Sequence, residues 1–239
     1  MKNILITGGC SGLGKDLSLS FKNAGYNVIA TYCNSKDYTL LKNEGIDTYK
    51  CDLSDEDSIN ELYSYIVGKY NYIDVLINNA ALEEDSEVSF KTKESFMKTF
   101  NVNVFGPFLI TRLIGDLMYE NKTGKIIFIS SNNSMGKEDP VTMEYDASKC
   151  AVNSLVKNFA KHYAPYVIVN GIAPGWILTD RVIRQNNDLN GCLEKEESKK
   201  ILLNRFASTE DISNLLLFMS SDKCNYIDGE IIKIDGGSR

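Results

Sequence analysis

A tyrosine and a lysine four positions apart, Tyr145 and Lys149, are the residues of this chain best placed to move a proton. On a helix, positions i and i+4 share a face, so the two side chains would lie together. A phenol normally ionises near pH ~10, and a neighbouring ammonium lowers that pKa by favouring the phenolate. The pair predicts general acid and base chemistry on an oxygen such as that of a carbonyl. Ser131, upstream at the end of an apolar run, can hydrogen-bond the same oxygen.

A glycine-rich turn, Thr7-Gly8-Gly9-Cys10-Ser11-Gly12-Leu13-Gly14, stands between a strand-like run and a helical pattern. Gly8 permits a sharp turn, and Gly12 and Gly14 remove side chains where backbone approaches a phosphate and where helix meets sheet. A helix start offers free N–H groups to a pyrophosphate. The turn and the proton-transfer residues together predict a hydride-transfer enzyme with a nicotinamide cofactor. The alternative for the turn is a tight structural loop.

These residues need a sheet to position them, and the pattern of the chain predicts one. Short runs rich in Val and Ile alternate with longer helical patterns, as expected for a parallel sheet with helices on both faces. We predict one α/β domain spanning residues 1–239, a doubly wound Rossmann-type fold with a seven-stranded parallel sheet. The predicted strands are residues 4–7, 27–31, 47–51, 73–77, 125–130, 167–171 and 231–234. The predicted helices are residues 12–24, 36–43, 55–70, 93–119, 145–163 and 209–220, with Ser54 and Thr209 at the starts of the third and the last.

Composition narrows the class of protein further. The chain has 239 residues, 43% of them hydrophobic, which suits one globular domain. A net charge of −6 with both signs interspersed argues against nucleic acid as a partner. The sequence has no apolar signal region and no membrane-spanning run, so we expect a cytoplasmic protein with no membrane contact. The 6 cysteines form no C-x-x-C pair and no metal spacing with His162, so we expect reduced thiols and no metal site.

Five motifs, in order along almost the whole chain, resemble those of the short-chain dehydrogenase/reductase family. Residues 7–14 match T-G-x-x-x-G-x-G, and Asn78-Asn79-Ala80-Ala81 resembles N-N-A-G. Tyr145 to Lys149 match Y-x-x-x-K, and residues 170–175 match N-x-x-x-P-G. Asp235-Gly236-Gly237 resembles the family's C-terminal ending. Within the family, the overall pattern is most similar to bacterial 3-oxoacyl-[acyl-carrier-protein] reductases.

The resemblance implies a role for each catalytic candidate. Tyr145 is the general acid and base, and Lys149 lowers its pKa and binds the nicotinamide ribose. Ser131 positions the substrate oxygen, with Ser130 as its rival. Asn103 holds a proton-relay water, with Asn101 as the rival choice.

The resemblance also implies a cofactor site in which Asp52 caps the adenine amine. No acid ends the second predicted strand to bind a ribose 2′-hydroxyl, which favours NADP(H). NAD(H) stays an alternative, because the expected arginine is missing too and Ser11 stands in the turn. The 2′-phosphate of NADP(H) would meet Ser11, Asn34, Ser35 or Lys36. The implied cofactor residues are Gly8, Ser11, Gly12, Leu13, Gly14, Tyr32, Cys33, Asp52, Leu53, Asn79, Ala80, Tyr145, Lys149, Pro174, Gly175, Ile177 and Thr179.

The substrate stays open between two kinds. A reductase of carrier-bound 3-oxoacyl thioesters presents basic residues to its acidic carrier protein. Here Lys122 stands near one such place, but Ala164-Pro165-Tyr166 offers no base. A hydroxysteroid, a sugar or another small alcohol or ketone is the alternative substrate. A non-catalytic dinucleotide sensor is the alternative of another class.

Two further expectations concern the surface. Residues 180–204 are weakly patterned and mix apolar with charged side chains, so we predict a mobile lid over the substrate. The resemblance implies a homo-oligomer, a tetramer or a dimer, paired through the helices at 93–119 and 145–163. The apolar residues expected to be presented there are Phe100, Val104, Phe108, Val152, Leu155 and Phe159.

Overall fold

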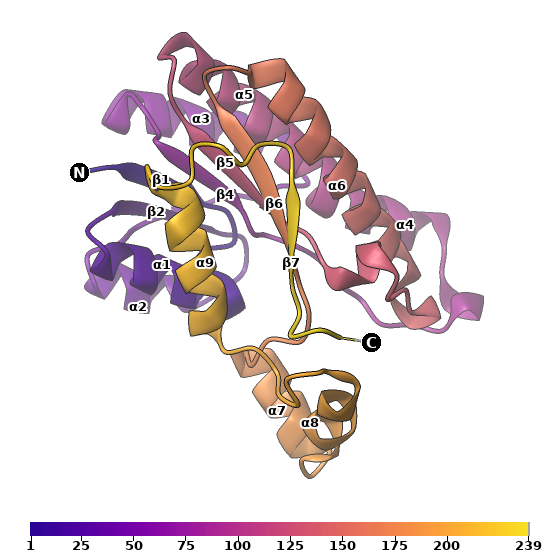
Figure 1. The fold of residues 1–239 in the computed structure, drawn as a ribbon. Helices are drawn as coiled ribbons and strands as arrows, with labels where there is room; N and C mark the ends of the chain where they lie inside the picture. Colours follow the sequence, from indigo (N-terminus) through magenta and orange to yellow (C-terminus); the bar gives the residue numbers. More distant parts are fainter. Residues whose placement is uncertain (239) are drawn as a thin grey trace.

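One sheet of seven parallel strands organises the molecule, in the order β3-β2-β1-β4-β5-β6-β7 (Figure 1). The computed structural model describes residues 1–238. The order of strands reverses between β1 and β4, as in a doubly wound sheet. The predicted fold class is confirmed. The strands are β1 (Asn3–Ile6), β2 (Asn27–Tyr32), β3 (Asp47–Lys50), β4 (Val75–Asn78), β5 (Lys125–Ile129), β6 (Ile168–Pro174) and β7 (Ile231–Ile234).

Helices cover both faces of this sheet (Figure 1). One face carries α1 (Gly12–Asn23), α2 (Tyr38–Asn43) and α9 (Thr209–Ser220). The other carries α3 (Glu56–Tyr70), α5 (Gly106–Glu120) and α6 (Met143–Tyr163). Shorter turns of helix lie at Val88–Phe90, Asn132–Met135 and Pro140–Thr142.

Apolar strands buried on both faces explain the continuous hydrophobic runs of the sequence. In β1, Leu5 packs into the core under α3, α5 and α6. Its neighbours Ile4 and Ile6 pack into the core under α1 and α9. Successive side chains of a strand point to opposite faces, so a strand between two helical layers must be apolar at every position.

The single helix predicted at 93–119 is broken in the structure. It consists of α4 (Lys93–Phe100), one π-helical turn (Asn101–Phe105) and α5. A π turn inserts an extra residue and often marks a functional site. The break ends at Gly106, where a Cβ would stand 2.4 Å from the carbonyl oxygen of Leu53. The close approach of α5 to the loop after β3 therefore requires glycine.

Two helix starts lie one residue from their predicted caps. Asp55, not Ser54, caps α3 by accepting the N–H of Asp57 at 3.1 Å. Ser208, not Thr209, caps α9, and its hydroxyl accepts the N–H of Asp211 at 3.1 Å. Ser54 is unavailable as a cap because its N–H and hydroxyl both donate to Asp52.

The expected apolar outer surface of the helices is smaller than predicted. Val104, Val152 and Phe159 are buried in the core of their own subunit, so they present no surface to a partner. Phe105 is 49% exposed and Phe108 38% exposed. For Val104 the reason is the π turn, which changes which residues of 101–108 face inward. Val152 and Phe159 lie on the side of α6 that packs into the core.

An arm of the chain, residues 180–204, projects beyond the sheet at the end where β6 finishes (Figure 1). It contains α7 (Asp180–Asp188), α8 (Cys192–Glu197) and a short 3₁₀ turn (Ser198–Lys200). Its far end returns to the body of the protein, where Leu203 N–H donates to Gly236 O at 3.1 Å. The weak helical pattern at 180–204 therefore corresponds to two short helices.

Candidate active site

The glycine-rich turn and the loop after β4 meet at the carboxyl ends of β1 and β4. The Thr7 hydroxyl accepts hydrogen bonds from Asn79 N–H at 3.0 Å and Ala80 N–H at 3.1 Å. The Asn79 amide donates to Thr7 O at 3.0 Å. In an open parallel sheet, ligands bind at such a point, where the order of strands reverses.

The turn leaves a backbone-lined cradle at the start of α1. A Cβ on Gly14 would stand 2.2 Å from Gly8 O and 2.6 Å from the Asn79 amide nitrogen. Gly12 has a φ of +49°, and a Cβ there would meet no protein atom within 4 Å. The Ser11 side chain makes no capping hydrogen bond, so it does not block the first N–H groups of α1. These features fit the pyrophosphate of a dinucleotide.

The predicted adenine end of the site lies beyond β2 and β3. Tyr32 stacks on Tyr38, with ring centroids 4.4 Å apart and planes at 4°. Asp52 accepts both the N–H and the hydroxyl of Ser54, and these hydrogen bonds lower the pKa of its carboxyl. Leu53 is buried beside it. A 580 Å³ cavity there is lined by Cys33, Asn34, Tyr49, Lys50, Asp52, Asp55, Asp57, Ser58 and Glu61.

The remaining predicted cofactor residues lie at the end of β6 and just after it. Gly175 N–H donates to Ile234 O at 3.2 Å, and a Cβ on Gly175 would stand 2.9 Å from that of Asp235. Ile177 pairs with Ala207, and the Thr179 hydroxyl caps α7. With Pro174 at the end of β6, these residues bring the start of the arm to the same edge of the sheet as the glycine turn.

Tyr145 and Lys149 lie in the first two turns of α6, beside the end of β5. The Lys149 ammonium donates to Ile129 O at 2.7 Å and lies 5.4 Å from the centre of the Tyr145 ring. Burial lowers the pKa of Lys149 to about 8.

The pKa of Tyr145 differs from the sequence expectation. It is raised, first by burial and then by the negative charge of Glu83, while a hydrogen bond with Ser131 acts in the opposite direction. The ammonium of Lys149 favours the phenolate too weakly to produce the expected lowering of the pKa. Removing a phenolate from water costs more free energy than an ammonium beyond hydrogen-bonding distance supplies. The phenol therefore keeps its proton at neutral pH.

The structure separates each catalytic candidate from its rival. Ser131 acts on the Tyr145 phenol, whose pKa it lowers, whereas the Ser130 hydroxyl donates to Asn153 at 2.6 Å. Asn103 is 1% exposed, and its amide donates to the Ser148 hydroxyl at 3.0 Å. Ser148 in turn donates to Tyr145 O at 2.6 Å. Asn103, Ser131, Tyr145 and Lys149 are thus brought together.

Sequence reasoning missed two charged groups beside these residues. Glu83 follows the β4 motif and pairs with Arg181 of α7 at 3.4 Å. Lys91 and Glu144, both almost fully buried, form an ion pair directly before Tyr145. The signals were present as an acid after Asn79-Ala80-Ala81-Leu82 and an acid next to Tyr145. Neither reveals its partner, because the partners lie on other elements.

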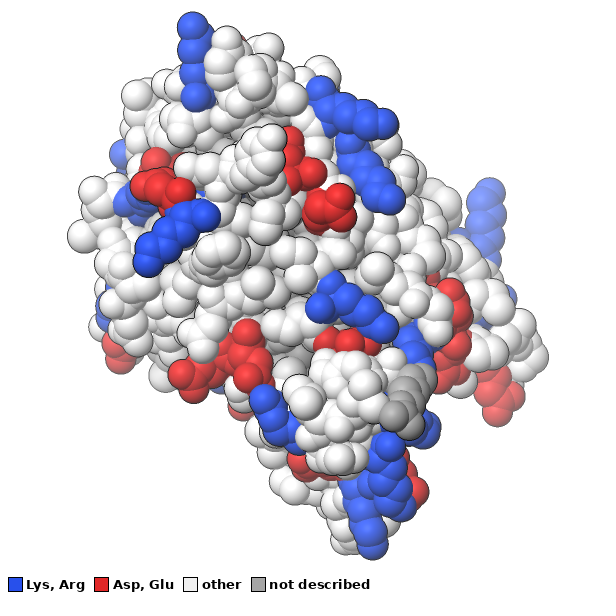
Figure 2. All heavy atoms as spheres, viewed as in Figure 1, with Lys and Arg blue, Asp and Glu red and all other residues white. Residues whose placement is uncertain are grey.

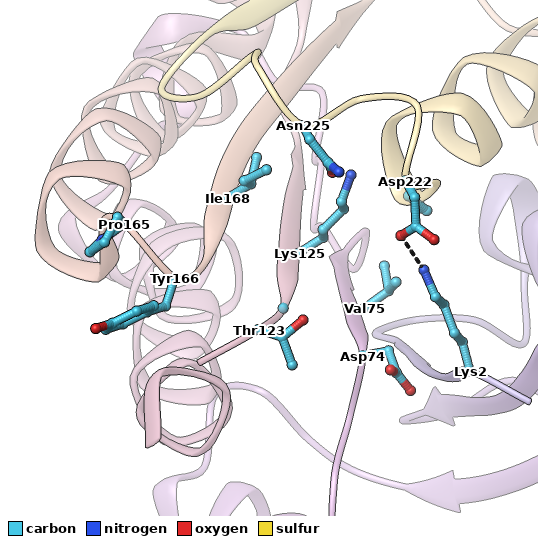
Figure 3. A pocket seen from close by; sticks show the side chains of 12 residues that line it. Lys2, Asp74, Val75, Thr123, Lys125, Pro165, Tyr166, Ile168, Asp222 and Asn225 are labelled. Atoms are coloured by element: carbon cyan, nitrogen blue, oxygen red, sulfur yellow. Dashed lines mark hydrogen bonds and ion pairs between the residues drawn. The ribbon is translucent and has the colours of Figure 1, made fainter. Parts of the chain in front are cut away.

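A second cavity, of 320 Å³, lies at the opposite, amino edge of the sheet (Figure 3). Its charged groups are already partnered. Lys125 donates to Met219 O at 3.2 Å and Cys224 O at 2.6 Å, and Lys2 pairs with Asp222 at 2.7 Å (Figure 3). Lys125 thus satisfies carbonyl groups at the end of α9, a structural role.

Comparison with known proteins gives three findings. Residues 2–190 match the family model described as short chain dehydrogenase. The 3-oxoacyl-[acyl-carrier-protein] reductase FabG of Thermotoga maritima is 33% identical, over 99% of this chain and 97% of that protein. Two solved structures superpose with a TM-score of 0.91 over 99% of this chain: ElxO with NADP bound, at 29% identity and 98% of its length, and levodione reductase, at 25% and 96%.

The cradle predicts different outcomes for two glycines. Gly14→Ala should destabilise the protein by about 2 kcal/mol or more, because its Cβ would overlap backbone and the Asn79 amide. Gly12→Ala should cost only about 1 kcal/mol of backbone strain, yet weaken dinucleotide binding, because its Cβ points into the cradle. Thermal unfolding and NADPH fluorescence titration separate the two effects. Wild-type unfolding temperature in the Gly14 variant would contradict this geometry.

Lys149 predicts a pH-dependent stability. The pKa of Lys149 is about 8 in the folded protein and 10.5 in an unfolded chain. Between these pH values the unfolded chain therefore binds more protons than the folded protein. The contribution of this group to the free energy of unfolding therefore rises with pH across that window. The stability of Lys149→Met relative to wild type should be greatest below pH 8 and should decline toward pH 10.5, in urea unfolding of cofactor-free protein. Exposed Lys157→Met is the control; a pH-independent difference for both variants would refute the burial argument.

Proposed function

The chain belongs to the short-chain dehydrogenase family, and on that premise we propose that Tyr145 is the general acid and base of its reaction. The protein is an NAD(P)-dependent oxidoreductase that acts on a carbonyl or alcohol group. The observation that carries the proposal is the meeting of Tyr145, Lys149 and Ser131 at the edge where the glycine turn forms its cradle.

The residues divide the proton chemistry among them. A bound reduced nicotinamide supplies the hydride. Ser131 holds the carbonyl oxygen, and Tyr145 donates its proton to that oxygen. A phenol is protonated at neutral pH, so Tyr145 can serve as the acid in the reduction of a ketone. Lys149 holds a positive charge beside the ring, and Asn103 orders the relay that returns a proton to it.

We favour NADP(H) as the cofactor. ElxO, which this chain resembles along its whole length, was solved with NADP bound. No carboxylate ends β2 to repel a 2′-phosphate, and Asn34 and Lys36 are exposed there to receive it. Ser35 is less suited, because its hydroxyl donates to Cys10 O at 2.9 Å.

Two substrate classes follow from the relatives. The Thermotoga maritima protein is named for 3-oxoacyl-[acyl-carrier-protein] reduction, which makes a 3-oxoacyl thioester one candidate. A compact ketone is the other, and the surface supports it. Lys122, the base nearest an expected carrier contact, lies over the Tyr166 ring at 5.7 Å, and the loop beside it carries no further base. A carrier protein is acidic and so is this chain, at net charge −6.

We infer a cytoplasmic homo-oligomer, a tetramer or dimer joined through α5 and α6. Phe105 and Phe108 expose aromatic surface there, less than expected but enough to seed an interface. No helix within residues 1–238 is long and apolar enough to cross a membrane. On the face seen in Figure 2, Lys and Arg are interspersed with Asp and Glu, so no broad basic surface invites nucleic acid there.

A substitution at Tyr145 distinguishes an enzyme from a dinucleotide sensor. Tyr145→Phe removes only the hydroxyl, so turnover of a ketone with NADPH should fall by about 10² or more, the scale of general acid catalysis. Cofactor affinity should change little, because the cradle is untouched. Tyr166→Phe, at a surface tyrosine, is the control. Full turnover in Tyr145→Phe would show that the phenol is not the acid.

The second prediction concerns the cofactor. Wild type should bind NADPH more tightly than NADH in fluorescence titrations, and Tyr32→Asp should shift the preference toward NADH by placing a carboxylate where the 2′-phosphate would lie. Tyr38→Asp, one ring further in the stack, is the control for loss of stacking alone. Equal or tighter NADH binding by wild type would reverse the assignment.

A further inference from the structure

Glu83 belongs to a loop whose backbone is fixed by hydrogen bonds to a buried side chain. Both main-chain polar groups of the preceding residue, Leu82, bond to the Asn103 amide: Leu82 N–H donates to Oδ1 at 2.7 Å, and Nδ2 donates to Leu82 O at 2.9 Å. The same Nδ2 reaches Ser148, the residue before Lys149. The loop carrying Glu83 is therefore fixed to the wall that positions Tyr145 and Lys149.

The carboxylate of Glu83 has little to hold it in place. Its one hydrogen bond among residues 1–238 is to the Arg181 guanidinium at 3.4 Å, long and through one oxygen only. Its side chain is 35% exposed, and burial raises its pKa. Hydrogen bonds from Leu82 through Asn103 and Ser148 to Tyr145 O place the loop of Glu83 against the start of α6. The charge of Glu83 is the second cause, after burial, of the raised pKa of Tyr145.

A partly desolvated acceptor at this place discriminates between substrates. An apolar acyl chain laid against Glu83 would remove its remaining water and return no hydrogen bond, which is costly for a charged group. An anionic substrate would be repelled by it. A substrate that carries a hydroxyl or ammonium next to its carbonyl would donate to the free oxygen, and sites that hydrogen-bond a substrate group reject analogues lacking it.

We propose that Glu83 is a specificity-determining residue that accepts a hydrogen bond from a donor group on the carbon next to the substrate carbonyl. The substrate class is then a compact polar ketone rather than a fatty-acyl thioester. The inference rests on the proposed ketone reduction, and it names which ketones that site takes. Arg181 pairs with Glu83 at 3.4 Å, and its positive charge opposes the rise in the pKa of Glu83 that burial causes.

Three ketones of equal size test this directly: hydroxyacetone, aminoacetone and 2-butanone. With NADPH and wild-type protein, kcat/KM for one or both donor-bearing ketones should exceed that for 2-butanone by about tenfold or more, the scale of one hydrogen bond to a charged group. The ratio of kcat/KM for hydroxyacetone to that for aminoacetone shows whether a hydroxyl or an ammonium is the preferred donor. An acetoacetyl thioester is the fourth substrate.

Glu83→Leu should reduce the preference to about threefold or less and should improve turnover of the thioester, since the carboxylate no longer needs hydration. Its matched control is Glu84→Leu, at an exposed neighbour paired with Lys98, which should keep the wild-type preference. Opposite shifts on the two substrate classes cannot come from a general loss of structure.

Three results would overturn the inference: equal kcat/KM for all three ketones in wild type, a preference that survives Glu83→Leu, or an equal loss on every substrate in that variant. In each of these the ketone reduction itself stands. If wild type oxidises NADPH with none of the four substrates, the proposed function fails and the inference fails with it.

Discussion

The closeness of the turns that follow β1 and β4 is the constraint on which the rest of the site depends. Thr7 ties the two turns with its hydroxyl, and a Cβ on Gly14 would overlap both Gly8 O and the Asn79 amide. With no side chains there, α1 can begin against the sheet and point its N–H groups at a phosphate. The cofactor position set by this contact determines where a carbonyl must lie, and so where Tyr145 and Ser131 are needed.

The catalytic side chains are costly for the fold. Burial lowers the pKa of Lys149 and raises that of Tyr145, so it disfavours the ammonium and the phenolate. The protein offsets part of this cost locally, with the Lys149 bond to Ile129 O and the Ser148 link between Asn103 and α6. Such a concentration of unfavourable burial at one edge of the sheet is typical of an active site rather than of a binding module.

The glycine turn and the sheet that carries it were predictable from the sequence, whereas the contacts around Tyr145 were not. Gly8, Gly12 and Gly14 owe their positions to backbone within one short segment, so spacing alone identifies them. The central strands β1, β4 and β5 were predictable because they form nearly continuous apolar runs buried between two helical layers. The π turn at 101–105 was missed because an inserted residue leaves no mark on composition. The raised pKa of Tyr145 was missed because it depends on burial and on Glu83, which belongs to another element.

The π turn shows how separate elements become one site. By inserting an extra residue it turns Asn103 inward, where the amide bonds the loop after β4 on one side and α6 on the other. The loop after β4 begins with cofactor residues and continues into Glu83, while α6 begins with Tyr145. A single buried amide therefore joins the loop that carries Glu83 to the helix that carries Tyr145. The glycine cradle comes from one local turn, whereas the arrangement of Tyr145, Asn103 and Glu83 depends on contacts between elements far apart in the chain.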